Sequence, residues 1–241
     1  MEWILFALSF LTAIISATLG MAGGTILLTF MLLLLPAPTV IPLHAINQFV
    51  SNARRAWLLQ KQIIASFFLY FALGSLLGNI LSYYLMKSFG LAHWIPLVIA
   101  LLILYSVFKP KKMPALQIPA WAYLLVGFLI GLIGLFIGAV GLILGLFLMR
   151  DDLDKKQIIA TMAAMQTLNH LLKVISFIVL GFAFEQHLWA ILALTAGSLL
   201  GTGLGVRLLD YLPEKIFRTI FRTILVVAAL KILLEKGMAY F

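Results

Sequence analysis

Apolar residues dominate this chain, and its organisation follows from the places where the apolar runs stop. The interruptions are glycines, prolines and short basic clusters, and the runs between them have lengths typical of membrane helices. We predict helices over residues 3–19, 23–35, 42–60, 63–86 and 92–108, and then over 119–137, 141–149, 155–181, 186–209 and 214–235.

Two of the apolar segments are interrupted by glycine. A continuous helix over residues 3–35 would be about 50 Å long, too long for a bilayer core of about 30 Å. The cluster Gly20-Met-Ala-Gly-Gly24 therefore predicts a break into two shorter helices, and the prolines between 36 and 42 predict the turn that follows. Glycines at 138–141 predict a similar break later in the chain.

A stripe of polar residues runs through the predicted helix 42–60. At about 100° per residue, these side chains fall within roughly 140° of one helix face. Each polar group left without a partner in lipid costs several kcal/mol, so the stripe should face the protein interior. Its members are His44, Asn47, Gln48, Ser51, Asn52 and Arg55.

The stripe has a counterpart 118 residues later in the chain. Gln48 aligns with Gln166, Ser51 with Asn169, Asn52 with His170, and Arg55 with Lys173. The first glycine cluster aligns with residues 138–142 at the same offset, and Gly-Ser-Leu-Leu-Gly at 74–78 recurs at 197–201. Three matches in the same order predict an internal duplication, with repeats at 1–108 and 119–241 joined by a basic linker, 109–118.

Composition identifies the class of protein. Of the 241 residues, 64% are hydrophobic and 10% are charged, against about 25% charged in soluble domains, which indicates an all-α integral membrane protein. The net charge of +9 comes from basic residues near span ends, where they act as topology determinants rather than as a nucleic-acid site. The chain has no cysteine, which excludes thiol chemistry and disulfides, and its first apolar run is expected to stay in the membrane rather than be cleaved.

The basic residues also distinguish two topologies. We set aside Arg54, Arg55 and Lys173, which leaves 14 basic residues. If each glycine-broken segment crosses the membrane once, they divide six against eight; if each is a hairpin, they divide eleven against three. The positive-inside rule favours hairpins. We therefore expect two inverted repeats, each a glycine-broken hairpin plus three transmembrane helices, with the linker 109–119 in the cytoplasm and both termini outside.

The two aligned cations suggest an anion site. Lys173 lies near the middle of a predicted span, where a charge is costly and usually functional, and Arg55 is its counterpart. All eight acidic residues lie at or near span ends, so neither polar stripe contains a carboxylate and a bound anion is the expected counter-charge. The structural alternative is that each cation extends to the lipid headgroups.

Other groups on the stripes could serve the same anion. A glycine break exposes backbone N–H groups at a helix N-terminus, although glycine also allows close helix packing, which we expect for the Gly-Ser-Leu-Leu-Gly pair. The amides could bind substrate or link helices, and the histidines could donate hydrogen bonds or carry a proton. The predicted substrate-binding residues are Gly23, Gly24, His44, Gln48, Asn52, Arg55, Gly141, Gln166, Asn169, His170 and Lys173; no catalytic residue, metal site or cofactor is expected.

This order of motifs resembles the TauE/SafE sulfite exporter family over essentially the whole chain. The resemblance rests on a glycine-rich break followed by His-x-x-x-Gln-x-x-x-Asn-x-x-Arg, duplicated across a basic linker. The second break is thinner in glycine than the family pattern, and neither break is soon followed by the expected proline. The matching positions are Gly20, Gly23, Gly24, His44, Gln48, Asn52 and Arg55, and then Gly138, Gly141, Gln166, Asn169, His170 and Lys173.

The resemblance implies a multi-pass transporter of small sulfur-containing anions such as sulfite, sulfonates or sulfoacetate. We expect a secondary transporter, working as an exporter in the cell membrane by alternating access around a central cationic site. An anion channel is one alternative, and a membrane enzyme acting on a lipid or small anion is another, although we find no nucleophile–base pair or metal cluster for catalysis. The expected partners are the anion and the lipid bilayer, not nucleic acid; a homodimer is left open.

Overall fold

The computed structural model describes residues 1–89, 117–135, 140–220, 223–224 and 226–227. All regular structure in these residues is helical, as the sequence predicts, and short 3-10 turns lie at Gln60–Gln62, Ala120–Ala122 and Phe184–His187. The predicted helix 92–108 and the linker up to residue 116 lie outside the described residues, and of the predicted helix 214–235 residues 214–220 are helical. The main helices are α1 (Glu2–Leu19), α2 (Gly23–Leu34), α3 (Ala37–Leu58), α4 (Ala65–Phe89), α6 (Tyr123–Gly134), α7 (Gly141–Leu148), α8 (Lys155–Val179) and α9 (Leu188–Tyr211).

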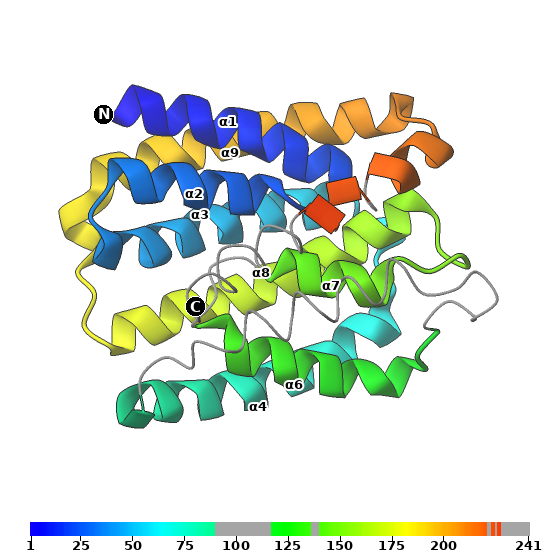
Figure 1. Ribbon diagram of the computed structural model, residues 1–241, viewed down its shortest axis with the longest axis horizontal. Helices are drawn as coiled ribbons and strands as arrows, with labels where there is room; N and C mark the ends of the chain where they lie inside the picture. The colour runs from blue at the N-terminus through cyan, green and yellow to red at the C-terminus, as the bar shows by residue number, and fades with distance from the viewer. Residues whose placement is uncertain (90–116, 136–139, 221–222, 225, 228–241) are drawn as a thin grey trace, which may run out of the picture.

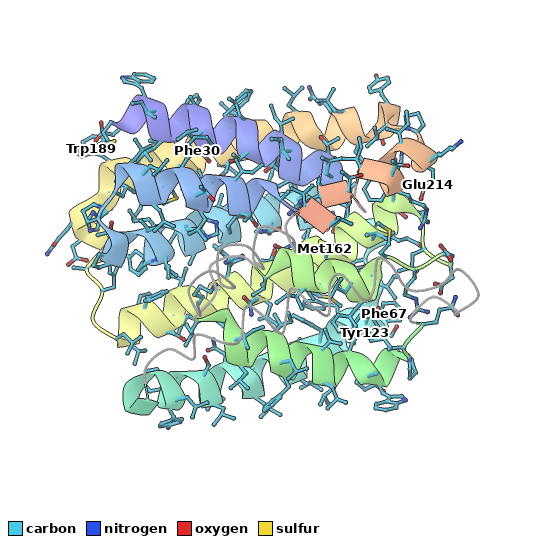
Figure 2. All side chains as sticks on the ribbon, in the orientation of Figure 1. Phe30, Phe67, Tyr123, Met162, Trp189 and Glu214 are labelled. Atoms are coloured by element: carbon cyan, nitrogen blue, oxygen red, sulfur yellow. The ribbon has the colours of Figure 1, made fainter. Side chains whose placement is uncertain are left out.

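Several of these helices are suited to a membrane. Within the described residues, four segments are long and apolar enough to cross one: Glu2–Leu19, Ala65–Leu85, Lys155–Val179 and Phe184–Tyr211. The outward surfaces of the helices carry apolar side chains (Figure 2). Exposed tryptophans lie at both ends of the helices, Trp3 and Trp189 at one end and Trp57 and Trp121 at the other, as in the aromatic belts of membrane proteins.

The first glycine break forms as predicted. Helix α1 ends at Gly20, which has a φ of 79° and donates its N–H to the Ser16 carbonyl oxygen at 2.8 Å. This left-handed conformation suits glycine and satisfies a carbonyl at the helix end. Helix α2 begins three residues later at Gly23 and runs back alongside α1. The second break separates α6 from α7, and residues 136–139 within it lie outside the described residues.

The predicted turn over the prolines is wrong. Helix α3 begins at Ala37, directly after Pro36, and not near residue 42. Pro38 stands in the first turn, where a backbone N–H would have no partner within the helix in any case. Pro42 lies inside the helix, where it removes one hydrogen bond without ending it. The extra turn lengthens the helix that carries the first polar stripe.

Helices from the two halves of the chain pair with each other. Helix α1 packs along α9, α4 packs along α6, and α3 packs against α8 between the two pairs (Figure 1). In Figure 1 the helices α1, α3 and α9 run from left to right, whereas α4, α6 and α8 run from right to left. Helices α2 and α7 also run in opposite directions, and each lies beside the central pair.

The contact between α4 and α6 is made backbone to backbone. A Cβ atom built at Gly74 would lie 1.9 Å from the Leu124 carbonyl oxygen, and one at Gly78 would lie 2.0 Å from that of Phe128. Only glycine allows this approach, so the first Gly-Ser-Leu-Leu-Gly segment is a packing surface, as predicted.

The second Gly-Ser-Leu-Leu-Gly segment makes the same contact between α9 and α1. A Cβ atom at Gly197 would lie 2.4 Å from the Phe6 carbonyl oxygen, and one at Gly201 would lie 2.2 Å from that of Phe10. Phe6 and Phe10 stand 118 residues before Leu124 and Phe128, which are the partners in the other pair. The offset that aligns the polar stripes therefore also aligns the partners of the two glycine surfaces.

Charged residues position the start of α8. Asp154 accepts hydrogen bonds from the N–H groups of Lys156 and Gln157, and Gln157 bonds back to the Asp154 N–H, which forms a capping box. In the preceding loop, Arg150 donates from Nε and Nη2 to the two carboxylate oxygens of Asp152 at 2.9 and 2.8 Å. These hydrogen bonds lower the pKa of the Asp152 carboxyl, so the pair stays ionised at neutral pH.

Candidate functional site

The packing of α3 against α8 brings the two polar stripes together inside the protein. Every member of both stripes is buried, and none exposes more than 6% of its surface. The prediction that the polar stripe of each helix faces the protein interior is therefore confirmed. The side chains concerned are His44, Asn47, Gln48, Ser51, Asn52 and Arg55 on α3, and Gln166, Asn169, His170 and Lys173 on α8.

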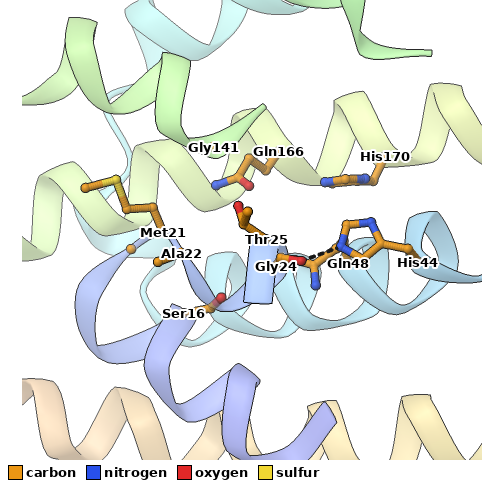
Figure 3. A pocket seen from close by; sticks show the side chains of 11 residues that line it. Ser16, Met21, Ala22, Gly24, Thr25, His44, Gln48, Gly141, Gln166 and His170 are labelled. Carbon is orange, nitrogen blue, oxygen red and sulfur yellow. Dashed lines mark hydrogen bonds between the residues drawn. The ribbon is translucent and has the colours of Figure 1, made fainter. Parts of the chain in front are cut away.

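A small cavity lies where the stripes meet the glycine breaks (Figure 3). It is bounded by the end of α1, the start of α2, the start of α7, and the facing sides of α3 and α8. Six predicted site residues line it: Gly24, His44, Gln48, Gly141, Gln166 and His170. Five more lining residues were not in the predicted set: Ser16, Gly20, Met21, Ala22 and Thr25.

The first turn of α2 and the first turn of α7 each contact a glutamine amide. A Cβ atom at Gly24 would lie 2.9 Å from Gln48 Oε1, and one at Gly141 would lie 2.9 Å from Gln166 Oε1. The first N–H groups of α2 and α7 lack partners within their helices, and they form the positive ends of the helix dipoles. Gln166 Nε2 is buried with no hydrogen-bond partner among the described residues. The cavity thus combines backbone and amide donors in two equivalent arrangements.

The loop between α1 and α2 forms one wall. Ala22 caps the start of α2 with a φ of 73°, the one positive φ of a residue other than glycine in the described part of the chain. Such a conformation strains an alanine and often accompanies a functional site. Thr25, in the first turn of α2, points toward Gln166 across the cavity (Figure 3).

The two histidines meet at the cavity although they belong to different helices. Their ring centroids are 6.0 Å apart and their planes make an angle of 73°. His44 Nε2 lies 2.8 Å from the Gly24 carbonyl oxygen, an acceptor, so this nitrogen carries the hydrogen (Figure 3). Nδ1 of both rings is buried and without a hydrogen-bond partner among the described residues.

Arg55 does not line the cavity. Its guanidinium donates from Nη1 to the Ser16 carbonyl oxygen and from Nη2 to Asn52 Oδ1. Asn52 in turn donates from Nδ2 to the Gln48 carbonyl oxygen at 2.7 Å. Arg55 and Asn52 therefore connect the end of α1 to α3 behind the cavity wall, where a cation suits the negative end of the α1 dipole.

The remaining predicted residues also lie behind the wall. A Cβ atom at Gly23 would lie 2.0 Å from the Thr12 carbonyl oxygen, so this glycine lets α2 approach α1. Asn169 Nδ2 donates to the Ile130 carbonyl oxygen at 3.4 Å and so reaches the last turns of α6. Lys173 is buried on α8, and its charge acts on both histidine rings.

The chain was compared with known families and proteins. Residues 5–232 match a family described as "Sulfite exporter TauE/SafE". No curated protein and no solved structure matches the chain. Within the described residues, no group of three or more His, Cys, Asp or Glu side chains is arranged to hold a metal ion.

Proposed function

The chain belongs to the TauE/SafE sulfite exporter family, and from this membership we propose that it is a secondary transporter that exports small sulfur-containing anions across the cell membrane. The proposed substrates are sulfite, sulfonates and sulfoacetate. The observation that carries the proposal is the cavity between α3 and α8, where hydrogen-bond donors and no acidic side chain line the wall among the described residues. Transport rather than catalysis is the activity of the family, and an enzyme is not proposed.

The donors of the cavity suit a small oxyanion. Oxygen atoms bound to sulfur accept hydrogen bonds, and the N–H groups at the starts of α2 and α7 can supply them. Gln166 Nε2 is buried with no partner in the described part of the chain, and buried donors are almost always satisfied, so an anion oxygen is a suitable acceptor. We propose that Gly24, His44, Gln48, Gly141, Gln166 and His170 contact the substrate.

The other predicted residues support this site from behind. Arg55 and Lys173 are buried cations outside the cavity lining, and they raise the electrostatic potential where the anion binds. Asn52 positions the Arg55 guanidinium that binds the Ser16 carbonyl at the end of α1, and Gly23 lets α2 approach α1. Asn169 contacts the last turns of α6. The site is cationic through these two residues, while the direct contacts come from neutral donors.

We propose that the chain consists of two inverted repeats, residues 1–108 and 119–241, joined by the linker 109–118. The support is the opposite direction of corresponding helices and the equivalent glycine contacts of α4 with α6 and of α9 with α1. Each repeat would contribute a glycine-broken hairpin and three transmembrane helices. Movement of one part of the bundle around the central cavity would then give alternating access.

Basic residues support one orientation. We call the end where α3, α7 and α9 finish, and α4 and α8 begin, the basic end. By the positive-inside rule this end faces the cytoplasm, together with the linker 109–119, and both termini lie outside. The residues that define it are Lys61, Arg150, Lys155, Lys156, Arg207, Lys215 and Arg218.

Ligand binding to the purified protein tests the proposed function. We expect at least one of sulfite, thiosulfate, sulfoacetate, taurine and sulfate to raise the melting temperature. Gln166→Glu should abolish this stabilisation because it places a carboxylate where the anion binds. Gln60→Glu, an exposed substitution of the same kind, should not change it. If no anion stabilises the parent, or Gln166→Glu binds normally, the anion site is wrong.

Vesicle transport then separates a carrier from a channel. In proteoliposomes loaded with unlabelled anion, a carrier takes up labelled anion transiently against its gradient, because both species share one alternating site. A channel shows no such counterflow and does not saturate at moderate concentrations. We expect saturation and counterflow, and uptake without either would favour the channel.

A further inference from the structure

Two buried imidazoles share the cavity with the proposed anion donors. His44 and His170 each expose 1% of their surface, and their rings lie edge to face with 6.0 Å between centroids. The His44 Nε2–H is held by the Gly24 carbonyl oxygen, so its Nδ1 has a free lone pair. His170 Nδ1 likewise has no partner among the described residues. The open acceptor on His44 and the unpartnered ring nitrogen of His170 beside it together form a binding site for a proton.

In the described part of the chain, the side-chain charge that acts on the two rings is positive. Lys173 on α8 acts on both rings, and Arg55 is buried on α3. Helices α2 and α7 contain no titratable residue. The inward polar residues of α1, α4 and α9 are serine, threonine and asparagine, and α6 offers only Tyr123 in its first turn. No carboxylate faces the pair from these elements in the described part of the chain.

This arrangement makes the binding of a proton depend on the binding of an anion. In the empty cavity, burial and the positive charge of Lys173 both oppose an imidazolium. An anion in the same cavity offsets that repulsion, and the new N–H of the imidazolium can donate to an anion oxygen. Linkage is reciprocal, so the proton must tighten anion binding by the factor by which the anion tightens proton binding.

We propose that the His44–His170 pair binds one proton together with each anion, so that the transported unit is the anion plus a proton. The proton adds to Nδ1 of one ring, forms an N–H bond with its lone pair, and leaves when the anion leaves. Nothing is oxidised or reduced. The proposal rests on the proposed function, since it requires an anion in this cavity.

Proton uptake during binding tests the proposal directly. The purified protein in weakly buffered solution is titrated with sulfoacetate, and separately with thiosulfate, because neither takes up protons itself near neutral pH. We expect the solution to become more alkaline, approaching one proton bound per anion. In buffered solution the dissociation constant should rise by up to about tenfold for each pH unit above neutral. Binding of either probe with no proton uptake between pH 6 and 9 overturns the proposal and leaves the proposed function standing.

Substitutions identify the group that takes the proton. His44→Gln keeps a side-chain donor for the Gly24 carbonyl but removes the imidazole, and His170→Gln removes the other ring. We expect at least one of them to bind anion without proton uptake, while His187→Gln, a histidine on the 3-10 turn before α9, behaves as the parent. Uptake that persists in both cavity variants overturns the assignment. The parent titration does not depend on whether these variants fold, and failure of both probes to bind counts against the proposed function itself.

Discussion

The contact between a helix start and a glutamine is the smallest unit of the site, and it occurs twice. Gly24 lies against Gln48, and Gly141 lies against Gln166, with the same distance of 2.9 Å from the Cβ position to the amide oxygen. The sequence alignment pairs Gly141 with Gly23, one residue away from the glycine that makes the equivalent contact. In each half, glycine leaves space for the amide beside the first backbone N–H groups of a helix.

We predict that Gly24→Ala and Gly141→Ala each weaken anion binding by about tenfold, or about 1.4 kcal/mol. The added methyl group would displace the amide at its flexible end, which should affect the site more than the fold. Binding titrations and melting temperatures measure the two effects separately.

Gly203→Ala on α9 is the matched control for these substitutions. A Cβ atom there meets nothing within 4 Å, so alanine should bind anion normally and stabilise the helix slightly. Normal binding in both Gly24→Ala and Gly141→Ala would show that the glutamine amides do not contact the anion.

Arg55 acts on the site through the end of α1. Its two hydrogen bonds fix the Ser16 carbonyl and Asn52, and Ser16 lines the cavity. We predict that Arg55→Gln lowers the free energy of unfolding by about 1.5–3 kcal/mol, as expected for loss of hydrogen bonds from a charged donor, and also weakens anion binding. Melting temperature and binding titration measure the two losses.

The neighbouring Arg54 provides the comparison. Its guanidinium lies 4.8 Å from the ring centroid of Trp57 and takes no part in the cavity. Arg54→Gln should therefore retain both stability and binding. If the two arginine variants behave alike, the contacts of Arg55 with α1 are not important for the site.

The sequence predicted which faces of α3 and α8 form the site, but it did not predict the lining residues in the loop between α1 and α2. Polar residues at helical spacing placed His44, Gln48, Gln166 and His170 on inward faces, because unpartnered polar groups are excluded from lipid. Met21 and Ala22 carry no such signal, since apolar residues in a glycine loop are equally suited to lipid or to a cavity wall. The partner of Arg55 on α1 is a backbone carbonyl, and every residue has one, so the sequence does not indicate which carbonyl is bound.

At the scale of helices, glycines identified breaks more reliably than prolines identified turns. The first glycine cluster separates α1 from α2 at the predicted residues because Gly20 adopts a positive φ. Pro38 and Pro42 did not delay the start of α3. Proline is unfavourable only where it removes a needed N–H, and a helix buried among others tolerates one such loss.

We predict that Gly78→Ala and Gly201→Ala each destabilise the protein by about 1–3 kcal/mol, the usual effect of overfilling a packed interface. The new methyl group would lie about 2 Å from a backbone carbonyl of α6 or α1, and the two helices would have to separate. Thermal unfolding in detergent measures the change, again with Gly203→Ala as the control. If Gly78→Ala and Gly201→Ala are as stable as this control, the helices are not held at backbone contact.

At the scale of the whole molecule, the two halves interlock. Helix α1 packs against α9 and α4 packs against α6, so the first and last long helices of each described half lie against the other half. The duplication was predictable because polar and glycine motifs recur in order. The sequence did not predict which outer helices pack against each other. These helices are apolar on most faces, so many different pairings would bury similar surfaces.

We predict that the basic end faces the cytoplasm. Glu185 precedes α9 at the opposite end, whereas Lys215 follows α9 at the basic end, so single cysteines at these positions should lie on opposite sides of the membrane. The chain has no cysteine of its own, so an impermeant thiol reagent added to intact cells reports only the introduced residue. Glu185→Cys should be labelled at once, and Lys215→Cys only after the membrane is permeabilised. The reverse result would invert the orientation, and equal external labelling of both cysteines would show that α9 does not cross the membrane.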